Sequence, residues 1–149
     1  MVDLIEPARP VEADRSPTVT VTPVDVATLR RLIDQWSNQL GRPKSWDLVG
    51  ILDYKPFDTA FVARKNQESV GAVTLNQNEV VGLYVVPEER RHGYAEALLK
   101  QAAVYCEQQG FPTVMIEVAD TRAEALVRKL MEDPAYANRF QITEAYRDV

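Results

Sequence analysis

The sequence is poor in the residues that signal export, metal binding or a membrane span. Its 149 residues include one cysteine, Cys106, and one histidine, His92. No disulfide can therefore form within the chain, and a lone histidine makes no metal site, so no metal is expected. No stretch approaches the roughly 18 apolar residues of a membrane span, and the first residues lack the basic and apolar pattern of a signal peptide. These absences predict a cytoplasmic protein that makes no membrane contact.

Positive charge is also scarce. Lys and Arg number 17 against 22 Asp and Glu, which gives a net charge of -5. A nucleic-acid partner is therefore not expected, because such proteins usually carry a basic face. Residues 1–16 carry acids and recurrent proline but few apolar side chains, and this composition predicts a flexible arm. Residues 17–149 are long enough for a single domain with a real core.

The first half of the domain predicts one strand, one helix and a meander. TVTVT, at 18–22, alternates apolar and polar residues as a half-buried strand does. Thr22 is the expected cap of a helix that has Pro23 in its first turn and continues to Leu40. A second, short helix is expected over 46–52. Strand-like runs at 58–65, 69–76 and 79–86 are separated by short polar turns and predict an antiparallel meander.

The second half alternates helices and strands. After Pro87 the apolar spacing becomes helical and ends near Gly110. Residues 113–119 then form an apolar run typical of a central strand. A helix over 122–132 and a last strand over 140–146 follow. Two similarly directed strands joined by a helix make a βαβ unit, so the sheet is predicted to be mixed.

The connection PEERRHGYA, which follows the strand at 79–86, has an unusual composition for a turn. A helix that begins near Gly93 leaves its first N–H groups without partners, and glycine lets a ligand approach the backbone. Ala95 is small enough to keep that approach clear, and Arg90 and Arg91 add positive charge. Such a helix end binds phosphate well. The alternative is that the arginines are solvated and Gly93 only makes a turn.

VVGLYVVPEERRHGYAEALL resembles motif A of the GNAT superfamily of N-acyltransferases. Arg90, Gly93 and Ala95 fill the three defined positions of its signature, Gln/Arg-x-x-Gly-x-Gly/Ala. The resemblance implies an α/β fold with a mixed, mostly antiparallel central sheet, flanking helices and a βαβ core that binds acyl-CoA. It also implies that the strands at 79–86 and 113–118 splay apart to admit the thioester.

The resemblance further implies which residues bind acetyl-CoA, or another acyl-CoA. The backbone of Val85 and Val86 would bind the pantetheine arm, and the N–H group of one of them would stabilise the oxyanion. The implied pyrophosphate loop comprises Arg90, Arg91, His92, Gly93, Tyr94 and Ala95. Asp120 replaces the Asn of the family's motif B and is the last residue of the implied donor site.

The catalytic residues are less well defined by the sequence. Glu79 matches the position of a general-base glutamate in one branch of the family. The alternative is that Glu79 is an exposed acid that follows a turn. In motif B, Val127 stands where a tyrosine usually protonates the thiolate. Three alternatives follow. Either Tyr136 or Tyr84 protonates the thiolate instead, or the thiolate leaves without a general acid. In the third, the protein binds acyl-CoA or a partner and catalyses no transfer.

Two functions follow from the resemblance. The first is an N-acyltransferase that moves an acyl group directly from CoA to a primary amine, either a small molecule or a peptide. The alternative is a catalytically weak or inactive GNAT-fold protein that binds or regulates through a protein partner. The acceptor region implied by the family, 40–57, contains Trp46, Asp47 and Asp53, which would suit a cationic amine. A homodimer joined through the last strand is expected by family analogy.

Overall fold

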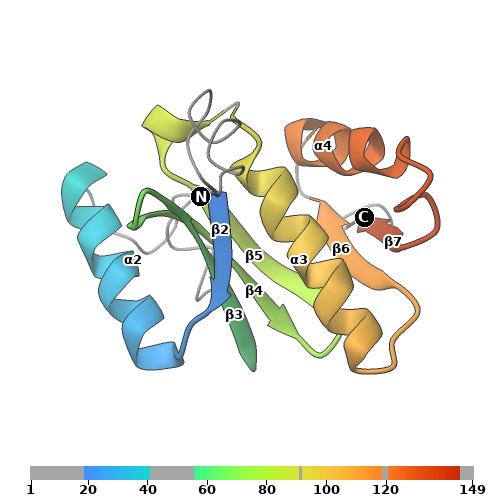
Figure 1. The fold of residues 1–149 in the computed structure, drawn as a ribbon, viewed down its shortest axis with the longest axis horizontal. Helices are drawn as coiled ribbons and strands as arrows, with labels where there is room; N and C mark the ends of the chain where they lie inside the picture. The colour runs from blue at the N-terminus through green and yellow to red at the C-terminus, as the bar shows by residue number, and fades with distance from the viewer. Residues whose placement is uncertain (1–18, 41–55, 91, 119–120, 145–149) are drawn as a thin grey trace, which may run out of the picture.

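A computed structural model describes residues 19–40, 56–90, 92–118 and 121–144 (Figure 1). The described residues form one six-stranded sheet with the strand order β2-β3-β4-β5-β6-β7. The strands are β2 (Val19–Pro23), β3 (Thr59–Lys65), β4 (Glu68–Asn76), β5 (Glu79–Val85), β6 (Val114–Val118) and β7 (Phe140–Glu144). The helices are α2 (Val26–Leu40), α3 (Tyr94–Gln108) and α4 (Thr121–Met131), with a short 3-10 turn, η3 (Pro87–Glu89).

The sheet has an antiparallel half and a parallel half. Strands β2 to β5 pair antiparallel in sequence order, whereas β5 pairs with β6, and β6 with β7, in parallel. The turn between β3 and β4 holds Asn66 and Gln67 at positive φ. Tight hairpins favour positive φ in such turns because it matches the twist of the strands. The predicted meander, the βαβ unit and the mixed sheet are confirmed.

Helices cover both faces of the sheet. Trp36 of α2 lies 5.3 Å, between ring centroids, from Tyr84 of β5. A Cβ built on Gly71 of β4 would lie 3.4 Å from Leu98 of α3. Tyr84 pairs with Ala72, and consecutive residues of a strand point to opposite faces, so α2 and α3 lie on opposite faces. Figure 1 shows α2 at the left, away from α3 and α4.

The start of α2 differs from the prediction. Thr22, the expected cap, pairs with Val62 within the sheet, and the N–H group of Val24 still donates to the carbonyl of Ala60 at 3.1 Å. Pro23, expected in the first turn of the helix, is instead the last residue of β2. Asp25 takes the cap position and accepts a 2.7 Å bond from the N–H group of Thr28. The predicted arm at 1–16 and the helix at 46–52 lie outside the described residues.

Candidate functional site

The ladder between β5 and β6 is short. Among the described residues these strands share two pairs, Glu79 with Met115 and Val80 with Ile116. On the other side, β5 stays paired with β4 as far as Val85. The remaining length of β5 therefore has no ladder partner in β6. This is the separation of the two strands that the resemblance implies.

Only one of the two predicted backbone contacts faces this separation. The N–H group of Val86 donates to the carbonyl of Val70, in line with β4, at 2.8 Å. Neighbouring residues of a strand direct their backbone groups to opposite edges, so those of Val85 face away from β4. The 2.8 Å bond from Arg90 Nε to the carbonyl of Val85 agrees with that direction. In this structure the Val86 N–H group is thus bonded within the sheet, which leaves the Val85 N–H group as the candidate donor to a ligand.

Helix α3 begins with unused N–H groups. Gly93 occupies its N-cap position with a φ of 87°, and no side chain caps the helix. The first helical bond joins the N–H group of Ala97 to the carbonyl of Gly93 at 2.9 Å. The N–H groups of Tyr94, Ala95 and Glu96 therefore have no acceptor within the helix. A Cβ added to Gly93 would meet no atom within 4 Å, so there is room here for an anion.

Arg90 is used differently from its prediction. Its Nε donates to the carbonyl of Val85, and its guanidinium carbon lies 5.6 Å from the ring centroid of Tyr84, which is buried. These contacts fasten the loop to the end of β5. In this conformation Arg90 holds the corner in place, and its contact with a donor phosphate stays a prediction. The predicted donor residues Arg91 and Asp120 lie outside the described residues.

An ion pair between Lys65 and Glu89 lies beside the same corner. Lys65 Nζ lies 3.1 Å and 3.3 Å from the two carboxylate oxygens of Glu89, and His92 Nδ1 lies 3.4 Å from one of them. The bond from Lys65 lowers the pKa of Glu89, and the same bond raises the pKa of Lys65. Tyr94 is 1% exposed, and burial raises the pKa of its hydroxyl, so it stays protonated. Sequence reasoning missed the ion pair because Lys65 comes from a distant strand.

The two predicted catalytic residues lie apart. Glu79 is half-buried and pairs with Asn76, which places it on the face of the sheet that carries Tyr84 and α2. The ring of Tyr136 lies 6.5 Å from that of Phe140 and 5.4 Å from Lys100 Nζ of α3. Tyr136 therefore lies with α3 on the other face. The sheet separates the two residues, so this geometry does not support Tyr136 as the acid.

Helix α4 supplies no replacement at the motif B position. Val127 is 0% exposed and belongs to the hydrophobic core. Tyr84, the other tyrosine considered as an acid, is buried against Trp36. The burial of Tyr84 therefore does not support it as a proton donor.

Two buried hydroxyl groups could not be singled out from the sequence. Thr74 of β4 is 0% exposed and Ser37 of α2 is buried, and within the described part of the chain neither hydroxyl has a hydrogen-bond partner. Thr74 pairs with Gly82 and so lies on the face covered by α2. The only hint in the sequence is a threonine within an apolar strand, which is too common to single out.

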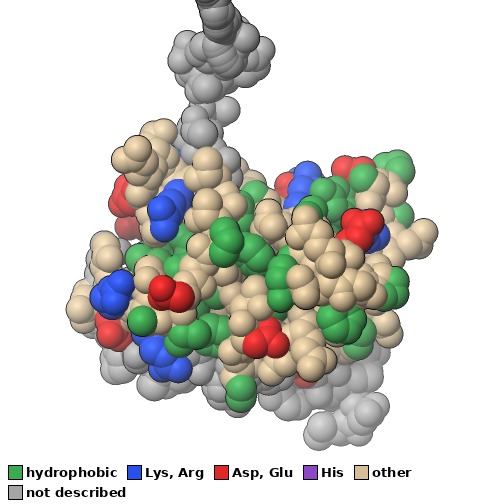
Figure 2. Space-filling model, turned by 60° about the horizontal axis from the view of Figure 1, so that its bottom comes forward, with side chains coloured by type: hydrophobic (Ala, Val, Ile, Leu, Met, Phe, Trp, Pro, Cys, Tyr) green, Lys and Arg blue, Asp and Glu red, His purple; other side chains and the backbone are tan. Residues whose placement is uncertain are grey.

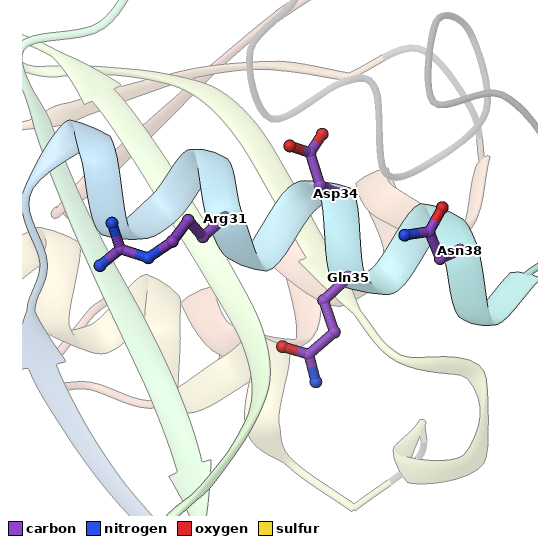
Figure 3. Close-up of a pocket in the computed structure, with 4 residues that line it drawn as sticks. All are labelled: Arg31, Asp34, Gln35 and Asn38. Atoms are coloured by element: carbon purple, nitrogen blue, oxygen red, sulfur yellow. The ribbon is translucent and has the colours of Figure 1, made fainter.

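A surface hollow lies elsewhere, along the outer side of α2. Figure 3 shows that its lining side chains, Arg31, Asp34, Gln35 and Asn38, all come from this helix and project in different directions. On the face shown in Figure 2, basic and acidic side chains are interspersed among apolar ones. Neither the hollow nor this face gathers convergent polar groups as the β5–α3 corner does.

In the described part of the chain no helix is long and apolar enough to cross a membrane.

Known structures share this fold at low sequence identity. An aminoglycoside acetyltransferase from an uncultured soil metagenomic sample aligns with a TM-score of 0.57 and 21% identity, over 76% of this chain and 90% of that one. The ribosomal-protein-S18-alanine N-acetyltransferase from Escherichia coli gives 0.56 and 19%, over 76% of each chain. AAC(6')-Iy, in complex with the bisubstrate analog CoA-S-monomethyl-acetylneamine, gives 0.56 and 14%, over 89% and 99%.

The family is shown by the sequence itself. The acetyltransferase (GNAT) family model matches residues 26–131, which is more than half of the chain. This range contains α2, the meander, the corner at Gly93 and α4. The resemblance inferred from motif A is confirmed, and the chain belongs to the acetyltransferase (GNAT) family.

Proposed function

We propose that the protein transfers an acyl group, acetyl in the simplest case, from CoA to a primary amine. The observation that carries this proposal is the meeting of two features at the end of β5. The β5–β6 ladder stops after two pairs, and α3 begins nearby with three uncapped N–H groups. AAC(6')-Iy, which has the same fold, is described with an analog that contains CoA. The acceptors named for its structural relatives, aminoglycosides and a ribosomal protein, support an amine as the substrate.

The corner fits the phosphates of CoA. A helix N-terminus favours anions through its oriented N–H groups and its dipole. The N–H groups of Tyr94, Ala95 and Glu96 would hold the pyrophosphate, and the open space over Gly93 would admit it. The backbone of Val85 would then bind the pantetheine arm along the unpaired edge of β5. When bound, acyl-CoA would supply a thioester carbonyl carbon with the CoA thiolate as its leaving group.

The transfer forms a C–N bond to the amine and breaks the C–S bond of the thioester. A proton leaves the amine nitrogen for a base, and the sulfur departs as a thiolate that afterwards takes up a proton from water. Glu79 is the proposed acceptor of the amine proton, since it is a half-buried carboxylate where the two strands begin to separate. No residue is assigned to the sulfur, because a thiol with a pKa of about 8.5 leaves tolerably without an acid.

The alternative is a GNAT-fold protein that binds acyl-CoA with little or no turnover. The buried Val127, at the position where motif B usually has tyrosine, favours it. Calorimetric titration with acetyl-CoA, followed by thiol release in the presence of aminoglycosides, small amines and peptides, separates the two functions. Amine-dependent thiol release establishes the transferase. Saturable binding with no release from any amine favours the binding protein.

The donor site is tested by a pair of glycine substitutions. Gly93→Ala places a methyl group in the space proposed for the pyrophosphate, and we expect the dissociation constant for acetyl-CoA to rise by roughly tenfold or more, about 1.4 kcal/mol. Calorimetry on the folded variant measures it. Gly110, just beyond α3, is the matched control because its φ is 91° and a Cβ there also meets nothing within 4 Å.

Gly110→Ala imposes a similar backbone strain, about 1–2 kcal/mol for a residue held in the left-handed region. Both variants should therefore lose similar stability, whereas only Gly93→Ala should lose acetyl-CoA affinity. Equal affinities for the two variants would remove the pyrophosphate from this corner.

A further inference from the structure

Strand β6 carries one charged residue, Glu117, on its open face. Val114 and Ile116 are buried, whereas Met115 is half-buried and Glu117 is exposed. Because consecutive residues of a strand point to opposite faces, Met115 and Glu117 share one face. Met115 pairs with Glu79, so this is the face that carries α2 farther along the sheet. Figure 1 shows α2 at the left, well away from β6 at the right.

Glu117 lies where β5 and β6 begin to separate. The last ladder pair of these strands joins Val80 to Ile116, so Glu117 is the first residue of β6 beyond it. Glu79 is on the same face, one strand away and two residues earlier along the ladder. With strands about 4.8 Å apart and a rise of about 3.3 Å per residue, the Cα atoms of the two glutamates are roughly 8 Å apart.

The two strands that separate carry only negative charge. Glu79 is the charged residue of β5 and Glu117 that of β6, and neither strand contains Lys, Arg or His. The basic residues Lys100 and Arg139 make their contacts on the side of the sheet that carries α3. Two carboxylates on one face attract a ligand with more than one positive charge, because each opposite charge nearby adds its own favourable interaction.

We propose that Glu117 binds a second cationic group of the acceptor, and that the preferred substrate is therefore a diamine or a larger polyamine. The proposal rests on the proposed function, in which Glu79 accepts the proton of the reacting amine. That amine must be neutral when it attacks. The second amine stays protonated and pairs with the Glu117 carboxylate. Glu117 is thus a specificity residue that holds the far end of the acceptor and takes no part in the proton transfer.

Three acceptors of equal chain length test the charge at the far end. They are 1,5-diaminopentane, 1-aminopentane and 5-aminopentanoate, whose second ends are cationic, neutral and anionic. Thiol release from saturating acetyl-CoA, measured with the full chain at one fixed pH, gives kcat/KM for each acceptor. We expect the wild type to prefer the diamine over 1-aminopentane by roughly five- to tenfold, as befits one partly exposed charge-assisted contact. The difference should lie mainly in KM, and 5-aminopentanoate should be the poorest acceptor.

Two substitutions at Glu117 and one control isolate its charge. Glu117→Gln keeps the size of the side chain and should remove most of the preference for the diamine. Glu117→Lys reverses the charge and should make 5-aminopentanoate a better acceptor than the diamine. Glu68→Gln, which removes an exposed carboxylate from the end of β4 remote from Glu79, should leave the preference unchanged. Calorimetric titration with acetyl-CoA checks that each variant retains its fold and its donor site.

The outcomes distinguish this inference from the function on which it rests. Equal kcat/KM for 1,5-diaminopentane and 1-aminopentane in the wild type, or a preference that Glu117→Gln leaves unchanged, would overturn the role of Glu117 and leave the transferase intact. Thiol release from other amines but from none of these three would overturn that role as well, because a simple dication would then not be accepted. Absence of thiol release from every amine tested would overturn the proposed function itself.

Discussion

Two threonines on opposite faces of the sheet have contrasting surroundings. The hydroxyl of Thr59 lies 3.0 Å from that of Tyr105 on α3, whereas the hydroxyl of Thr74 is buried and has no partner among the residues that the structure describes. A buried polar group without a bond retains its full desolvation cost. The same substitution should therefore have opposite effects at the two sites.

Thr74→Val removes the unpartnered hydroxyl and keeps the shape of the side chain, so it should stabilise the protein by about 1 kcal/mol. Thr59→Val breaks the bond to Tyr105 and should destabilise it by about 1 kcal/mol. Urea unfolding of both variants measures the difference. If Thr74→Val costs as much as Thr59→Val, its hydroxyl has a partner in solution.

Single-residue roles were predictable where the backbone decides them. Gly93 was placed at the start of a helix from spacing alone, and its φ of 87° is a conformation that glycine adopts readily. Arg90 was not predictable in the same way. A long side chain chooses among several acceptors, and its bond to Val85 depends on how the loop folds back onto β5.

At the start of α2, a cap residue decides where strand and helix meet. Asp25 accepts the N–H group of Thr28, and this backbone bond is the largest influence that lowers the pKa of Asp25. A carboxyl whose pKa is lower in the folded protein adds stability above its unfolded pKa. That stability is lost as the pH falls through the folded pKa.

Asp25→Ala should lower the melting temperature at pH 7 by a few degrees, because the helix loses its cap. Asp25→Asn keeps a side-chain oxygen at the cap position but has no charge, so it should lower the melting temperature less than Asp25→Ala. The gap between wild type and Asp25→Asn should shrink between pH 7 and pH 3, around the ordinary aspartate pKa of about 3.9. Thermal melts at both pH values test this, and a gap that widens at pH 3 would contradict it.

Elements were easier to predict than their boundaries and their partners. The strands from β3 to β7, and the helices α3 and α4, lie within a few residues of their predicted ranges because apolar period and glycine or proline stops define them. The cap of α2 was misplaced because two suitable residues, Thr22 and Asp25, stand three positions apart. The ladder to β3 decides between them, and a local pattern does not contain that ladder.

For the molecule as a whole, motif A was specific enough to predict the family and the sheet. Catalytic roles were harder to predict, because the general acid depends on which side of the sheet a residue occupies. Tyr136 shows this, since it follows α4 in sequence but lies on the face opposite Glu79. No periodicity in the sequence carries that information.

The two-pair ladder between β5 and β6 has a consequence for motion. Strands β2 to β5 are paired along most of their length, as are β6 and β7, so the sheet should open most readily where these two parts meet. Amide hydrogens along this seam, including that of Val85, should exchange with deuterium faster than those of β3 and β4. A donor that fills the seam would hold the two parts together, so saturating acetyl-CoA should slow exchange there first. Exchange that is uniform across the sheet and unaffected by acetyl-CoA would mean that the seam is rigid without it.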